Sequence, residues 1–245
     1  MEYRSKIKKL LLFTLIVFFG LTAQSWAALY SGSISSSDGT LVAGDRWANA
    51  NVSLSWEVDY DTASHPDLWT YSYNFAITNG PQNAQGISHV IIQTSEGVTE
   101  SALFPGTTAD ADVDEYGSEG GSNPGWEGSI FNGIKWNVGG DTLTLQWTVV
   151  TDHSPMWGDF YSKGGQSYAY NLGMDEDLTP VEAHANIANG NNVSFDDEGN
   201  RIAAYVLVPN SIGGPPSEVP APASLLLFGS GLMGVSLIRR KREKK

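Results

Sequence analysis

The sequence predicts an all-β protein: one antiparallel β-sandwich of jelly-roll type, flanked by an N-terminal signal peptide and a single C-terminal transmembrane helix. Three runs alternate apolar and polar residues with a period of two, the pattern of a strand with one buried face. These runs span 52–60, 69–77 and 142–149. Turn-forming clusters separate the runs, and no stretch of ten or more residues has the period of an amphipathic helix.

Weaker alternation predicts additional strands at 28–36, 87–94, 129–137, 156–162, 165–172, 191–196 and 201–208. About ten antiparallel strands in one domain favour two packed sheets, because each sheet must bury one of its faces. We expect this domain to span 28–210, a length that supports a core without disulfides. The chain has no cysteine, which excludes disulfides, thiolate catalysis, cysteine-based zinc sites and a lipidated cysteine.

Charge is distributed unevenly along the chain. The formal net charge is −13, but residues 28–238 carry only four basic residues against 25 acidic ones, a net charge of −21. Such an acidic surface repels phosphate backbones, so nucleic acid is excluded as a partner. Neutral sugars and divalent cations remain compatible with this charge.

The first 27 residues have the three parts of a secretory signal peptide. A basic start precedes the apolar run 10–21, and Ser25-Trp26-Ala27 supplies the small residues of a cleavage site. The apolar run is too short to span a bilayer comfortably. We therefore expect export, with cleavage after Ala27.

The last part of the chain has a second tripartite pattern. A Gly/Pro-rich linker, 211–218, precedes the motif Val219, Pro220, Ala221, Pro222. The apolar segment 223–238 follows, and its 16 residues would form a helix of about 24 Å, short of a hydrocarbon layer of about 30 Å. The tail 239–245 begins with a basic stop-transfer group: Arg239, Arg240, Lys241, Arg242. The positive-inside rule keeps such a tail in the cytoplasm, so the β domain would face outward.

Residues 219–245 resemble the PEP-CTERM sorting signal of Gram-negative bacteria, which combines a Pro-x-Pro motif, a short apolar helix and an Arg-rich end. The resemblance implies recognition at the inner membrane by an exosortase, a membrane-embedded transpeptidase that cleaves the tail. It also implies delivery to the cell surface or extracellular matrix. Ala221 departs from the family pattern, which has glutamate at this position. Two phrases of the β domain, 86–92 and 154–165, resemble uncharacterised ectodomains that precede such tails.

Catalytic patterns are weak in the β domain. The four histidines lack the short spacing of a metal-binding pair, and neither a nucleophile elbow nor a phosphate-binding loop occurs. Glu57 and Asp59 lie on the polar face of a predicted strand, where a glycoside hydrolase or lyase could place its carboxylates. We expect His89 to be a strand-face or core-edge residue.

Two further ligand hypotheses come from aromatic and acidic residues. Trp126 and Trp157 lie in loop or loop-edge contexts and are candidates for exposed platforms on which a sugar ring stacks. Asp110, Asp112 and Asp114 have the alternate spacing of a calcium-binding loop, without the other positions of an EF-hand. Calcium is the one cofactor that the sequence leaves open.

The sequence thus favours a non-enzymatic, exosortase-processed protein of the cell surface or matrix, associated with biofilm or exopolysaccharide. A carbohydrate-binding module of β-sandwich type is the first alternative. A glycoside hydrolase or lyase is the second. The expected partners are an exosortase, the inner membrane before processing, and an exopolysaccharide.

Overall fold

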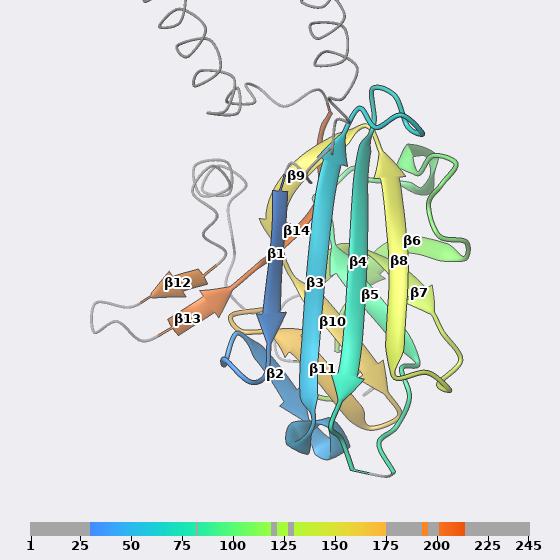
Figure 1. Cartoon of the computed structure of the whole chain (residues 1–245). Helices are drawn as coiled ribbons and strands as arrows, with labels where there is room; N and C mark the ends of the chain where they lie inside the picture. The colour runs from blue at the N-terminus through green and yellow to red at the C-terminus, as the bar shows by residue number, and fades with distance from the viewer. Residues whose placement is uncertain are drawn as a thin grey trace, which may run out of the picture.

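The computed structural model describes residues 30–81, 83–118, 122–126, 130–174, 193–195 and 201–213. These residues form β-strands and two short 3-10 helices, η1 (Asp45–Asn49) and η2 (Glu100–Ala102). The predicted signal peptide, transmembrane helix and basic tail lie outside the described residues. Figure 1 shows two β-sheets packed one behind the other, so the predicted all-β sandwich is confirmed.

The front sheet in Figure 1 contains all three strongly alternating runs. Its order is β1 (Tyr30–Ser35), β3 (Asn51–Tyr60), β4 (Trp69–Thr78) and β8 (Thr144–Thr151). The register places Trp56 opposite Tyr73, and Tyr73 opposite Trp147. Because side chains alternate between faces, this register brings the apolar residues of all three runs to one side.

The back sheet has six strands. Its order is β2 (Leu41–Gly44), β11 (Ser167–Asn171), β10 (Phe160–Gly164), β5 (His89–Gln93), β7 (Phe131–Asn137) and β6 (Ala111–Tyr116). All five neighbouring pairs are antiparallel. The predicted strands at 87–94, 129–137 and 165–172 are confirmed, whereas β2 and β6 were not predicted.

Aromatic side chains join the two sheets in the core. Phe75 of the front sheet meets Phe160 of the back sheet at 5.2 Å between ring centroids, and Trp147 meets Trp136 at 5.9 Å. Hairpins such as β3–β4 and β10–β11 join neighbours within one sheet. A jelly roll is a sandwich of eight strands folded as two Greek keys. The β-sandwich prediction is confirmed, and the jelly-roll topology stays a prediction.

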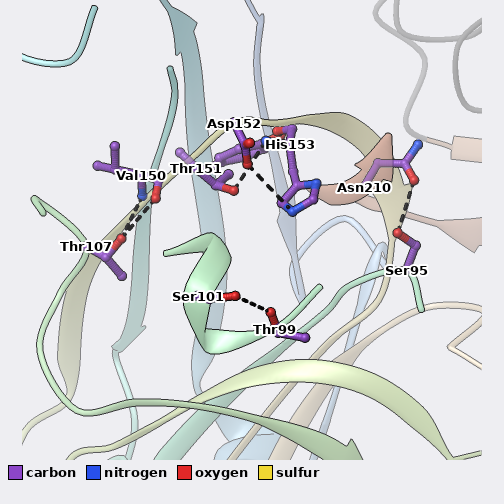
Figure 2. Close-up of polar contacts among 10 residues, drawn as sticks. Ser95, Thr99, Ser101, Thr107, Val150, Thr151, Asp152, His153 and Asn210 are labelled. Atoms are coloured by element: carbon purple, nitrogen blue, oxygen red, sulfur yellow. Dashed lines mark hydrogen bonds and ion pairs between the residues drawn. The ribbon is translucent and has the colours of Figure 1, made fainter. Parts of the chain in front are cut away.

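A separate ribbon crosses between the sheets. β9 (His153–Gly158) connects β8 to β10 and pairs with β14 (Val206–Gly213), while β12 (Val193–Phe195) pairs with β13 (Arg201–Ala204). Residues 203–210 are all buried, and the Tyr73 hydroxyl donates to the Leu207 carbonyl at 2.7 Å. Figure 2 shows the end of this buried stretch, where the Ser95 hydroxyl donates to the Asn210 side chain at 3.0 Å. β14 continues to Gly213, three residues into the predicted linker.

The free edge of β8 is covered by the loop 104–108. The amide groups of Phe104 and Thr108 donate to the carbonyls of Val150 and Thr148. In return, the Thr107 hydroxyl accepts from the Val150 amide at 2.9 Å and donates to its carbonyl at 3.2 Å (Figure 2). These bonds occupy backbone groups that an exposed edge strand would offer to another chain.

A second, smaller core lies on the outer side of the back sheet. We call it the outer aromatic cluster; its buried members are Ile91, Trp126, Phe131, Tyr161 and Met174. The loop 122–126 closes over it, and the Tyr161 hydroxyl donates to the Pro124 carbonyl at 2.8 Å. Gly125 has φ +69°, and a side chain there would clash with the Tyr168 ring. Its close approach therefore requires glycine.

Candidate functional site

The outer face of the front sheet carries polar side chains in two rows, all of them neutral except Glu57, and we call it the serine face. The first row crosses the four strands at Ser31, Glu57, Ser72 and Thr148. The second row crosses them at Ser33, Ser55, Asn74 and Gln146. These are the polar partners in the alternating runs, so the pattern that builds the core also builds this face.

A hollow of about 680 Å³ lies over the serine face, bounded on one side by Thr108. Its volume falls in the range of small-ligand sites. In Figure 1 no labelled strand lies in front of this sheet. The Oδ1 atom of Asn74 is buried and has no hydrogen-bond partner among the described residues. The hollow therefore offers hydroxyl and amide groups that can both donate and accept hydrogen bonds.

Glu57 lines this hollow, as expected for the hydrolase alternative, but it is the one acid among the described lining residues. Asp59 lies two residues farther along β3, about 7 Å away, and does not line the hollow. Glycoside hydrolysis ordinarily requires two carboxylates on opposite sides of the scissile bond. The described lining of the hollow thus supplies one of the two carboxylates.

Trp126 and Trp157 are buried, so the expectation that they form exposed sugar platforms is wrong. Trp126 is 6% exposed and lies 4.8 Å, between ring centroids, from both Phe131 and Tyr161. Trp157 is 7% exposed and packs edge-on against Trp56 at 6.4 Å. Both indoles fill cores, and a ring buried in this way has no face free to stack on a sugar.

A second hollow, of about 520 Å³, opens on the outer side of the back sheet. We call it the lysine pocket, because Lys135 of β7 and Lys163 of β10 both line it, with His89 of β5 beside them. His89 lies opposite Lys163 in the β5–β10 register. The Lys163 ammonium donates to the Ser122 carbonyl, and the Lys135 ammonium lies 5.6 Å from the centre of the Tyr116 ring.

His89 is the most buried polar group of the lysine pocket. Its side chain is 7% exposed, and its Nε2 atom has no hydrogen-bond partner among the described residues. Burial lowers the pKa of His89 to about 4, with further lowering by Lys135 and Lys163; a hydrogen bond with Asn123 acts in the opposite direction. The imidazole is therefore neutral at pH 7. No carboxylate is among the causes of this shift.

Carboxylates occupy the other side of the lysine pocket. Asp114 and Glu115 of the edge strand β6 line it, and both are exposed. Tyr116 has its pKa raised by burial first and then by Asp112, which places negative charge near its hydroxyl. The pocket thus combines two ammonium groups over the middle of the sheet with carboxylates at its edge.

The calcium-binding loop expected around Asp110, Asp112 and Asp114 is wrong as a local structure, because Ala111–Tyr116 form strand β6. Alternate residues of a strand lie about 7 Å apart, whereas calcium ligands lie about 2.4 Å from the ion. In the described part of the chain, no three His, Asp or Glu side chains are grouped to hold a metal ion. Calcium binding stays a prediction.

Sequence reasoning did not single out Lys135, Lys163 or Asn74. The scarcity of basic residues was the available signal, since Lys135 and Lys163 are two of the four between 28 and 238. Their convergence depends on the strand order β10-β5-β7, which alternation alone does not give. Asn74 carries no sequence signal beyond its place on the polar face of an alternating run.

Comparison with protein families gives one match, outside the described residues. The family model described as the PEP-CTERM protein-sorting motif matches residues 218–242. Comparisons with curated proteins and with solved structures give no match. A search of the described residues for a helix long and apolar enough to cross a membrane finds none. Residues 218–242 of this chain therefore match the PEP-CTERM protein-sorting motif, and they follow an all-β domain.

Proposed function

We propose that this chain is an exported, exosortase-processed protein of the cell surface or extracellular matrix with a non-enzymatic role. The match of the sorting motif to residues 218–242 carries the proposal. The motif implies an exosortase as partner and a membrane-docked sorting signal. The signal-peptide pattern of residues 1–27 agrees with it, because the two segments together would place the β domain outside the inner membrane.

The spacing between the β domain and the motif also supports processing. β14 ends at Gly213, and six residues, 214–219, separate it from Pro220. Six residues reach at most about 20 Å when extended. An enzyme in the membrane could therefore engage the motif while β14 stays paired with β9.

A matrix role agrees with the chemistry of the domain surface. The two hollows offer hydroxyl, amide and charged groups suited to hydrogen-bonding a polysaccharide. The hollow over the serine face has a single carboxylate in the described lining, which is one fewer than glycoside hydrolysis needs. We therefore favour adhesion to exopolysaccharide or biofilm over cleavage of it.

The sorting claim is tested by cell fractionation of motif variants. In Pro220→Ala/Pro222→Ala we expect the protein to stay in the inner membrane, because the exosortase no longer engages its signal. The matched control is Pro215→Ala/Pro216→Ala, which changes two prolines of the upstream segment and should leave delivery unchanged. Equal delivery of both variants to the outside would contradict the proposal.

A second candidate function, binding of a neutral glycan at the serine face, is favoured by one observation. The buried Oδ1 atom of Asn74 lacks a partner among the described residues, although buried polar atoms nearly always have one. A ligand hydroxyl entering the hollow would supply the missing donor. A neutral ligand is not repelled by a chain segment with a net charge of −21.

Titration with neutral oligosaccharides tests this second candidate. We expect Asn74→Ala and Ser55→Ala to weaken binding, since both side chains line the hollow. Ser53→Ala is the control, because Ser53 lies on the same face of β3 but outside the hollow. If all three variants bind the oligosaccharide with the affinity of the wild type, the serine face is excluded as the binding surface.

A further inference from the structure

The lysine pocket gathers two of the four basic residues found between positions 28 and 238. Its third contributor, His89, comes from the strand between them. Lys135 and Lys163 form no ion pair with a described residue, although the surrounding surface is rich in carboxylates. Two cationic side chains that line a shared hollow without an ion pair to a described acid favour an anionic partner.

The Nε2 atom of His89 gives an independent reason to expect a ligand. His89 lines the pocket with a side chain that is 7% exposed, and its buried Nε2 atom has no hydrogen-bond partner among the described residues. An unpaired polar atom at such depth is destabilising unless water or a ligand bonds to it. A neutral imidazole keeps one donor and one acceptor, so it can bond to an oxygen without adding charge.

The acidic side of the pocket restricts the kind of anion. Asp114 and Glu115 accept hydrogen bonds but repel a second negative group nearby. A ligand with one carboxylate and several hydroxyl groups satisfies both sides, because its carboxylate faces the ammonium groups and its hydroxyls face the acids. A phosphorylated sugar carries about 1.5 to 2 negative charges at pH 7, and the net charge of the domain opposes its approach.

We propose that the lysine pocket binds a uronate, with the sugar carboxylate paired to Lys135 and Lys163 and the ring hydroxyls bonded to Asp114, Glu115 and Asn123. The volume of about 520 Å³ suits a ligand of this class. The inference rests on the proposed function in one respect, since an extracellular polysaccharide would be the natural source of the uronate. The pocket itself is independent of the sorting signal.

Isothermal titration calorimetry on the full chain in detergent micelles tests the proposal. The probes are sodium glucuronate, glucose as the neutral match, and a polygalacturonate fragment. We expect glucuronate to bind about tenfold more tightly than glucose, because only glucuronate forms charged hydrogen bonds with the lysines. Tighter binding of the fragment than of glucuronate would identify a polymer as the source, and equal binding would identify the single sugar as the recognised unit.

Charge-removing variants assign the site. Lys135→Gln/Lys163→Gln should weaken glucuronate binding about tenfold or more, whereas Arg46→Gln removes a charge outside the pocket and should change nothing. The single variant Lys135→Gln is a second test. It keeps the hydrogen bond from Lys163 to the Ser122 carbonyl, whose loss in the double variant would disturb the loop 122–126. Unchanged binding in both lysine variants, equal affinity for glucose, or no binding of either acidic probe overturns the proposal. None of these results alters C-terminal processing, so failure here is distinct from failure of the sorting claim.

Discussion

The two outer faces of the sandwich differ in chemistry and in what lies over them. The serine face is polar and mostly neutral, and no described element lies over it. The outer side of the back sheet is covered in part by the loop 122–126, which closes over the outer aromatic cluster beside the lysine pocket. A sheet face that packs against a loop contributes to stability and holds a cavity in a fixed shape. An uncovered sheet face contributes little to stability and leaves its polar groups free to bind a ligand.

Trp126→Ala gives the largest expected effect, because it removes the centre of the outer aromatic cluster. We expect a loss of about 4 kcal/mol in the free energy of unfolding, measured by urea denaturation. Trp126→Phe keeps an aromatic ring and should lose much less. A change below about 1 kcal/mol in Trp126→Ala would mean that the loop 122–126 does not pack as described.

The pH dependence of the free energy of unfolding is the next effect in size, and it reports the protonation of His89. Its pKa is about 4 in the folded state and near 6.5 when unfolded, so the unfolded state binds the extra proton between these values. The free energy of unfolding therefore keeps its full value from His89 above pH 6.5. It falls by about 3 kcal/mol as the pH drops from 6.5 to 4. Unfolding of wild type and His89→Gln at pH 7 and pH 4 measures it. The same pH dependence in both proteins would show that His89 titrates normally.

The covered edge of β8 gives an intermediate effect. Thr107→Val/Thr108→Val removes the hydroxyls that accept from the amides of Val150 and Thr148, so stability should fall by about 2 kcal/mol. Thr99→Val is the control seen in Figure 2, because the Thr99 hydroxyl contacts Ser101 at an exposed position. The double variant should also self-associate more readily in sedimentation experiments, since its edge offers free amides.

The serine face gives the smallest effect on stability. Ser55→Ala should change the free energy of unfolding by less than about 0.5 kcal/mol, because its side chain is partly exposed and lies outside both cores. Thermal or urea unfolding measures this difference. A loss above about 1 kcal/mol would show that the face contributes to folding and would weaken the contrast with the outer aromatic cluster.

The predictable parts of the fold are those in which local pattern and packing agree. The alternation of 52–60, 69–77 and 142–149 predicted three strands, and the same alternation aligns Trp56, Tyr73 and Trp147 in the core. β6 was missed because Asp-Val-Asp alternation at a sheet edge resembles an acidic loop. At an edge, one face of the strand and one row of backbone groups meet water, so charged residues are tolerated.

The candidate site was less predictable, for a physical reason. The burial of Trp126 depends on a loop that folds back over the sheet, and loop sequences carry no periodicity that reports such contacts. The lysine pocket joins positions 89, 135 and 163 through strand order, which is a tertiary property. The sorting motif was predictable because its three parts are contiguous in the sequence and the match to 218–242 spans them.

The intact mass of the mature protein tests the sorting claim most directly. We expect protein from cells with an active exosortase to begin at Ala28 and to lack the apolar segment 223–238 and the basic tail. Protein from cells without the exosortase should retain both segments. A mature protein that keeps its residues through Lys245 in both kinds of cell would contradict exosortase processing.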